Sequence, residues 1–212
     1  GTTVFLYNST STPLAIQWET TAGAQPAINV GARGVGHVVV PNGSGTHFFT
    51  ADGTPFMAVA AIDSDQPESA NTKADWGFTL VPERMLTQQT MVGWGPGRDP
   101  LSNVRPNENG SPVWVMPVLT NGSSGPVNIC VDYDGDGVGP LTDSFGTAYD
   151  GKLTLNEFQS TTVYDPDGDQ TGMILYVCDM PIGSFTDYKL TAAWGQEPGV
   201  ASADEPGLDL GT

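Results

Sequence analysis

Acidic side chains at alternate positions are the strongest chemical signal in the sequence. The run Asp132-Tyr133-Asp134-Gly135-Asp136-Gly137 places three carboxylates two residues apart, beside glycine. This order matches the first half of an EF-hand-type loop, in which alternate side chains converge on one cation and a glycine allows a sharp turn. The pattern predicts that Asp132, Asp134 and Asp136 bind Ca²⁺.

The residues from Asp150 onward match the second half of such a loop. Asp150 precedes a glycine, Lys152 stands where a main-chain carbonyl coordinates, and Glu157 stands where a bidentate carboxylate closes the loop. The two halves form one site if residues 138–149 are an insertion. The alternative is an acidic loop without a ligand, in which several carboxylates would repel one another with no cation to offset them.

A second acidic cluster, Asp165-Pro166-Asp167-Gly168-Asp169, follows the predicted strand 161–164. Its order is that of calcium loops in extracellular repeat proteins, so Asp165, Asp167 and Asp169 are predicted to bind metal. They could complete the first site or hold a second ion. A surface turn rich in Asp and Gly is the alternative.

Cys130 and Cys178 are the only cysteines, and each closes a short apolar run that is followed by an acid. They could lie opposite each other on neighbouring strands, where a disulfide is predicted for a secreted protein. Two buried free thiols are the alternative. If the cysteines pair, Asp179 is drawn towards Asp132 and becomes a further candidate ligand.

Evidence for catalysis is thin. His37 and His47 stand alone within strand-like runs, and the sequence contains no Gly-x-Ser-x-Gly motif. The paired acids follow metal-loop spacing, not the placement that a glycosidase needs. We therefore predict that the chain is not an enzyme.

Two of the five tryptophans border glycine-rich turns, namely Trp94 and Trp194. An exposed tryptophan at such a turn could stack on a sugar, so these two are candidate ligand-binding residues. Trp18 and Trp114 lie inside strand patterns, where burial in the core is expected instead.

The charge of the chain narrows its partners. Seven Lys and Arg face 24 Asp and Glu, which gives a net charge of -17 at pH 7. Such a surface repels phosphate backbones and anionic lipid, so no nucleic acid and no membrane surface is expected as a partner. No segment approaches the roughly 18 apolar residues that span a bilayer, so no membrane insertion is expected either.

Short apolar runs between turn residues predict an all-β fold, an antiparallel β-sandwich or jelly-roll-like structure with long calcium-binding loops. The only helical turn is expected at 155–159. The predicted strands are 3–7, 14–19, 36–40, 47–50, 55–62, 76–81, 90–94, 112–119, 127–132, 152–155, 161–164, 173–178 and 188–193. We expect a single sandwich-type unit over residues 1–194, with a subdivision near 95–112 as the alternative, and an extended C-terminal tail over 195–212.

Several phrases of the sequence resemble a region of very long, repeat-containing bacterial cell-surface proteins. They are Gly93-Trp94-Gly95-Pro96-Gly97, Asn109-Gly110-Ser111-Pro112-Val113-Trp114-Val115, the two acidic clusters, and Ala192-Ala193-Trp194-Gly195-Gln196 with Gly207-Leu208-Asp209. The upstream Ala74-Asp75-Trp76-Gly77-Phe78 is loosely similar to extracellular domains of the IgGFc-binding type. The resemblance implies a secreted, cell-surface location and an adhesive or structural role, and it transfers no catalytic residue.

These observations predict a calcium-stabilised extracellular structural or adhesive module of a bacterial surface protein. Its partners would be other protein modules or copies of itself, with glycans as a further option. One alternative is a subunit of an extracellular filament or tube assembled by strand exchange, in which the N-terminal strand or the tail completes a neighbour's sheet. The other is a carbohydrate-binding module.

Overall fold

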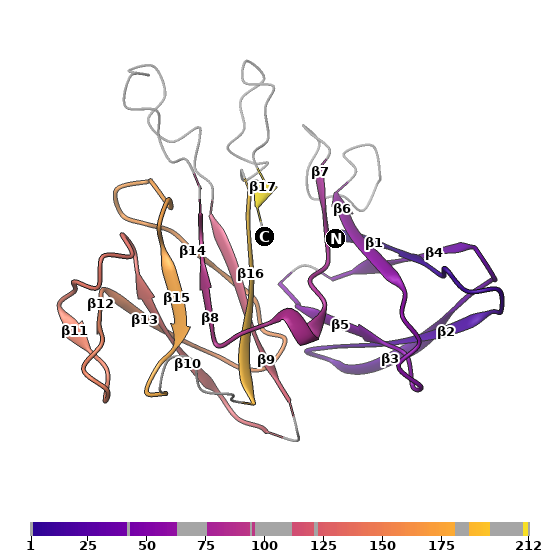
Figure 1. The fold of residues 1–212 in the computed structure, drawn as a ribbon, viewed down its shortest axis with the longest axis horizontal. Coiled ribbons are helices and arrows are strands. Elements are labelled where there is room, and N and C mark those ends of the chain that lie inside the picture. Colours follow the sequence, from indigo (N-terminus) through magenta and orange to yellow (C-terminus); the bar gives the residue numbers. More distant parts are fainter. Residues whose placement is uncertain are drawn as a thin grey trace, which may run out of the picture. The chain divides into compact units, whose positions relative to one another are not determined.

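A computed structural model describes residues 2–41, 43–62, 76–93, 95, 112–120, 123–180, 187–195 and 210–211. The chain divides into two compact units, Gly1–Leu80 and Val81–Thr212 (Figure 1). The division differs from the single unit expected over 1–194. It also falls upstream of 95–112, where the alternative subdivision was expected, and residues 96–111 lie outside the described residues.

The first unit is a sandwich of two antiparallel sheets. One sheet has the order β4-β1-β6-β7, and the other has the order β3-β2-β5. The N-terminal strand β1 pairs with β4 on one side and with β6 on the other, so it is an inner strand of its own sheet. The strands are β1 (Thr2–Tyr7), β2 (Leu14–Thr20), β3 (Gly23–Val30), β4 (Val35–Val40), β5 (Thr46–Phe49), β6 (Met57–Ile62) and β7 (Trp76–Thr79).

Alternation along the strands builds the core of this unit. On β1, Val4 and Leu6 are buried and Phe5 between them is 44% exposed. On β2, Leu14, Ile16 and Trp18 are buried in the same way and belong to the same apolar cluster. Both sheets therefore contribute one face to a common core.

The second unit is also a sandwich, and it carries both acidic clusters. One sheet has the order β13-β10-β15-β8, and the other has the order β14-β9-β16-β17. A short 3₁₀ helix, Glu83–Met85, precedes β8. The strands are β8 (Gln89–Met91), β9 (Val113–Leu119), β10 (Val127–Asp132), β11 (Leu141–Thr142), β12 (Ala148–Tyr149), β13 (Gly151–Leu155), β14 (Thr161–Val163), β15 (Ile174–Val177), β16 (Tyr188–Gly195) and β17 (Leu210–Gly211).

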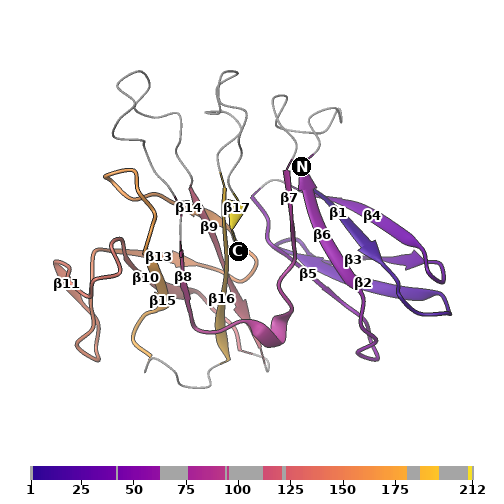
Figure 2. The same ribbon diagram turned by 45° about the horizontal axis from the view of Figure 1, so that its top comes forward.

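One apolar cluster fills the space between the two sheets of this unit. Val113 and Val115 of β9 are 0% and 1% exposed, and they join Ile129 of β10 and Leu175 of β15, which are both fully buried. At roughly 25 cal/mol per Å² of apolar surface, burial of such side chains is the main source of stability. The outer face of the β13-β10-β15 sheet is covered separately, by the hairpin β11–β12, which Figures 1 and 2 show beside β10 and β13.

The predicted all-β, antiparallel sandwich class is confirmed, and each of the thirteen predicted strand runs overlaps an observed strand. Four further strands, β3, β11, β12 and β17, were not predicted. The helical turn expected at 155–159 is wrong, because β13 continues to Leu155 and a turn closed by the Gln159 amide on the Asn156 carbonyl follows. Within the described residues, no helix is long and apolar enough to cross a membrane.

The C-terminal tail is described only at Leu210–Gly211, where β17 pairs with Trp194 and Gly195 of β16. Part of the predicted tail therefore forms an edge strand of the β14-β9-β16-β17 sheet. The remaining positions between 196 and 209 lie outside the described residues.

Candidate metal centre

The two acidic clusters meet because strands β10 and β15 are neighbours. In the register of this pair, Asp132 at the end of β10 lies opposite Ile174 at the start of β15. The loop that follows β10 and the loop that precedes β15 therefore leave the sheet at the same end. Segments about thirty positions apart in the chain are brought side by side by strand pairing alone.

Two glycines allow these loops to approach closely. A Cβ atom on Gly135 would lie 2.2 Å from the carbonyl oxygen of Gly172, which is too close for any side chain. Both glycines have positive φ, +64° and +90°, a conformation that other residues adopt at a cost. The glycine in the first acidic cluster is thus required by contact with the second.

Three carboxylates converge where the loops meet. One oxygen from each of Asp134, Asp165 and Asp167 lies within 4.8 Å of the others. Asp134 and Asp167 are exposed, and Asp165 is 4% exposed. Among the described residues this acidic triad is the group of side chains that could hold a metal ion.

Asp165 is the anchor of the acidic triad. Its main-chain amide donates to Oε1 of Gln170, which is fully buried and whose Nε2 donates to the Gly168 carbonyl. Its Oδ1 accepts the amide of Asp167 at 3.0 Å, whereas its buried Oδ2 has no hydrogen-bond partner. An unpartnered buried carboxylate oxygen is costly, and a cation is the natural partner for it.

Electrostatics at the acidic triad disfavour negative charge. Burial raises the pKa of Asp165 to about 6, and the charges of Asp167 and Asp134 add to this effect, although the Asp167 amide opposes it. The pKa of Asp134 is also raised, first by desolvation and then by the neighbouring carboxylates, of which Asp136 has the largest effect. A divalent cation would lower both pKa values, because its positive charge stabilises the ionised carboxylates.

The other predicted ligands of the two loops already accept hydrogen bonds from the main chain. Asp132 accepts the amide of Gly135 on Oδ1 and that of Gly137 on Oδ2, each at 2.9 Å. These bonds fold the first loop and use both of its oxygens. Asp136, Asp150 and Asp169 each accept one amide on one oxygen, from Val138, Tyr133 and Thr171. Asp167 likewise accepts the Asp169 amide, so what distinguishes the acidic triad is that its oxygens converge.

Lys152 lies within strand β13, and Glu157 lies beyond the far end of that strand. Residues 151–155 form β13, whose Gly151 lies opposite Val131 and whose Leu155 lies opposite Val127. At about 3.3 Å per residue the strand carries the chain about 13 Å away from the Asp132 end of β10. Beyond it, Oε1 of Glu157 accepts the Leu119 amide at 3.3 Å. The structure does not bring Glu157 to the loop that it was expected to close, because a strand replaces the second half of the loop.

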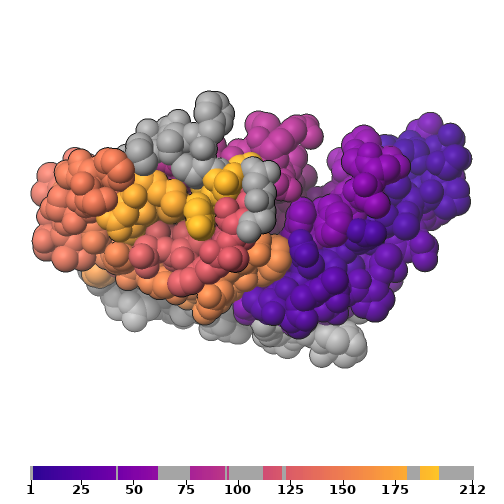
Figure 3. All heavy atoms as spheres, turned by 90° about the horizontal axis from the view of Figure 1, so that it is seen from below, coloured from indigo at the N-terminus to yellow at the C-terminus, as the bar shows by residue number. Residues whose placement is uncertain are grey.

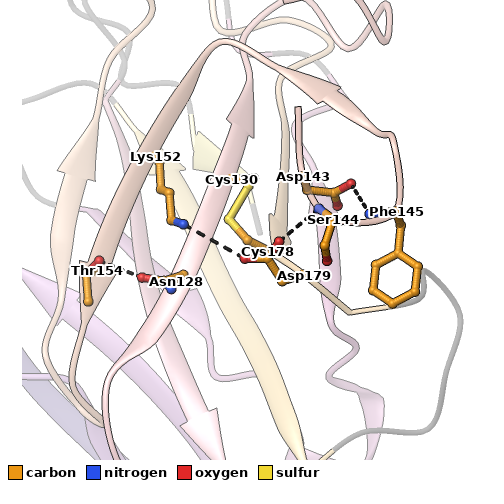
Figure 4. Close-up of polar contacts among 9 residues, drawn as sticks. All are labelled: Asn128, Cys130, Asp143, Ser144, Phe145, Lys152, Thr154, Cys178 and Asp179. Atoms are coloured by element: carbon orange, nitrogen blue, oxygen red, sulfur yellow. Dashed lines mark hydrogen bonds and ion pairs between the residues drawn. A yellow bond between two sulfur atoms is a disulfide. The ribbon is translucent and has the colours of Figure 1, made fainter. Parts of the chain in front are cut away.

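Residues 138–149, the predicted insertion, contain the hairpin β11–β12. Figure 4 shows the contact that its Ser144 makes with Asp179. The Ser144 amide donates to Oδ1 of Asp179 at 2.9 Å, and Lys152 Nζ lies 3.9 Å from Oδ2 of the same carboxylate. The Ser144 amide is the main reason why the pKa of Asp179 is lowered, and Lys152 contributes less. Asp179 therefore anchors the insertion and is not part of the acidic triad.

The predicted disulfide is present between Cys130 and Cys178, with Cα atoms 5.3 Å apart. It joins β10 to the end of β15 and is buried with Tyr149 and Tyr176 under the insertion. The bond therefore holds together the two strands whose ends carry the acidic loops.

The remaining candidates do not form a site in the described residues. Trp94 lies outside them, and Trp194 of β16 packs against the core of the second unit. His47 lies 2.9 Å from Glu19, and His37 lies beside the ring of Phe5, so the two histidines are placed separately. The sequence did not point to Gln170, whose role depends on burial that no local pattern reveals.

Comparisons with known proteins add no family to this geometry. No protein-family model, no curated protein and no solved structure matches the chain. The acidic triad, the disulfide and the fold are therefore the features that bear on function.

Proposed function

We propose that the second unit is a calcium-binding structural module of an extracellular protein, in which the ion joins the loop after β10 to the loop before β15. The observation that carries the proposal is Oδ2 of Asp165, which is buried, has no hydrogen-bond partner, and belongs to the acidic triad. An acidic cluster alone would be ordinary on a protein of net charge -17. An acidic cluster that contains a buried carboxylate oxygen without a partner is not ordinary, because the desolvation of that oxygen is uncompensated.

The donor set favours Ca²⁺ over other cations. The acidic triad offers only carboxylate oxygens, with no imidazole or thiolate, and hard oxygen donors suit Ca²⁺ and Mg²⁺ better than zinc or copper. Ca²⁺ tolerates irregular geometry, whereas Mg²⁺ demands a near-ideal octahedron. Asp134 and Asp167 lie on separate loops, an arrangement that suits the more adaptable ion.

An oxidising compartment fits the same unit. Cys130 and Cys178 form a disulfide, and such bonds persist outside the cell more than in the cytosol. Extracellular calcium modules bind with dissociation constants of roughly 10⁻⁴ to 10⁻³ M, so a site with three carboxylates is adequate there. An adhesive or structural role on a bacterial surface is the wider function we propose, and it involves no catalysis.

Neither alternative function has support from a described contact. Strand exchange through the N-terminal segment would require β1 to leave two ladders within its own sheet. Carbohydrate binding at Trp194 would use a side chain that packs against the core.

Calorimetric titration of Ca²⁺ into EDTA-treated protein, with parallel melting curves, tests the proposal. We expect saturable binding and a higher melting temperature, both lost in Asp167→Asn. Asp136→Asn is the matched control, because Asp136 is an exposed acid of the neighbouring loop outside the acidic triad and asparagine keeps its bond from Val138. Equal losses in the two variants, or no calcium binding by the wild type, would refute the site.

A further inference from the structure

Building on the proposed calcium site, we infer that the bound ion keeps coordination positions open towards solvent and that a carboxylate side chain of a partner protein fills them. In this view the ion has two tasks. It joins the loops, and it gives a strongly acidic surface a place that attracts acidic side chains.

The acidic triad supplies fewer ligands than a calcium ion takes. Ca²⁺ takes six to eight oxygens, and an EF-hand-type loop is completed by a bidentate glutamate. The acidic triad supplies three carboxylates, and Glu157, which the sequence pattern offered for closure, is bonded to the Leu119 amide beyond the far end of β13. The described chain therefore lacks the closing carboxylate.

The other acids of the two loops do not complete the site. Both oxygens of Asp132 accept amides within its own loop, and one oxygen each of Asp136, Asp150 and Asp169 accepts an amide. None of these four side chains belongs to the acidic triad. Recruiting Asp132 would break the two bonds that shape the loop. Hydrogen bonds to a charged group are stronger than those between neutral groups, so this side chain is a poor source of further ligands.

The vacant coordination positions would lie on the solvent side of the acidic triad. Asp165 is buried, and its main-chain amide donates to the buried Gln170 side chain. On the same side, Gly135 lies against the carbonyl of Gly172. Asp134 and Asp167 are exposed. Figure 1 places the start of β15, and with it both loops, at the top of the second unit, whereas Figure 3 shows the molecule from below. Vacant positions on the ion would therefore point away from the sandwich core.

A carboxylate is the ligand that suits the vacant positions. A carboxylate supplies two hard oxygens from one group, which is what the closing glutamate does in a complete loop. Without the ion, an incoming carboxylate would meet three carboxylates whose oxygens lie within 4.8 Å of one another, and it would be repelled. An acidic partner would therefore bind only to the calcium-loaded protein.

Terbium luminescence tests this inference, because Tb³⁺ takes oxygen ligands in calcium sites and its decay in H₂O and D₂O counts the waters bound to it. We expect at least about two bound waters in the Tb³⁺-loaded chain. The peptide acetyl-Gly-Glu-Gly-amide should displace about two of them, whereas acetyl-Gly-Gln-Gly-amide should displace none. Asp136→Asn should behave as the wild type.

Three results would overturn the inference. A Tb³⁺ ion with no bound water would mean that the chain closes its own site, and equal effects of the two peptides would exclude a specific carboxylate. Displacement by a uronic-acid disaccharide but not by the glutamate peptide would assign the position to a glycan. In all three cases Tb³⁺ still binds, so the proposed function would survive; absence of Tb³⁺ binding would instead refute the proposed function.

Discussion

Replacing Asp165 by asparagine should stabilise the protein in the absence of calcium, and calcium should remove that advantage. In EDTA at pH 7 the wild type carries an ionised carboxylate whose pKa is about 6 in the folded protein and about 3.8 in the unfolded chain. Each unit of difference corresponds to about 1.36 kcal/mol, so this charge costs the folded state up to about 3 kcal/mol. Asparagine is neutral and keeps an oxygen for the Asp167 amide.

We therefore expect Asp165→Asn to be more stable than the wild type in EDTA by about 2 to 3 kcal/mol. For a unit of this size that difference raises the melting temperature by roughly 10 °C. In calcium at about 100 times the dissociation constant, the wild type gains about 2.7 kcal/mol, and the variant, lacking a ligand, gains little. The advantage of the variant should then disappear or reverse.

Urea denaturation of both proteins, each in EDTA and in saturating calcium, measures all four free energies of unfolding. Asp136→Asn serves as the control, since it lies outside the acidic triad and should keep the calcium response. A lower stability of Asp165→Asn in EDTA would contradict this prediction, because the carboxylate would then be compensated within the chain. So would a full calcium response in the variant.

Three further predictions concern the same unit. In EDTA, wild-type stability should fall as pH rises from about 4 to 6, because the folded protein holds the Asp165 proton that the unfolded chain has already lost; a stability that rises over this range contradicts it. Gly135→Ala should cost more than about 3 kcal/mol in melting experiments and abolish calcium binding, since its Cβ would meet the Gly172 carbonyl, whereas Gly137→Ala, with positive φ but no atom within 4 Å, should cost only about 1 to 2 kcal/mol. Tyr176→Phe should leave stability unchanged or raise it by about 1 kcal/mol, because the buried hydroxyl has no hydrogen-bond partner; a large loss would show that the hydroxyl is satisfied.

The sequence was a good guide wherever a signal is local. Alternation of apolar and polar residues located β1 and β2, because one face of each strand must be buried. It failed at β3, whose burial pattern is mostly exposed or intermediate and which contains Pro26. A strand at the edge of a sheet needs little apolar surface, so it leaves a weak pattern.

The candidate site shows the same division between local and distant signals. Asp134, Asp165 and Asp167 were each predicted, because aspartates at alternate positions beside glycine form a local pattern. Their grouping was not predicted, since it depends on which strands pair. Glu157 fits an EF-hand-type spacing in sequence, yet β13 extends that spacing into a strand and carries the side chain to the other end of the sheet.

Pairing of the cysteines was predictable for a related reason. Each cysteine ends an apolar run of similar length, so neighbouring strands would bring them together, and β10 and β15 are neighbours. The order of the remaining strands carries no such marker. Strand order depends on loop lengths and on the total core that each arrangement buries, which no short segment records.

Anomalous diffraction from crystals grown with Tb³⁺ would locate the bound ion. We expect one strong peak within about 2.3 to 2.6 Å of carboxylate oxygens from Asp134, Asp165 and Asp167. A peak beside Asp132, Asp150 and Glu157, or no peak near the acidic triad, would contradict the proposed site.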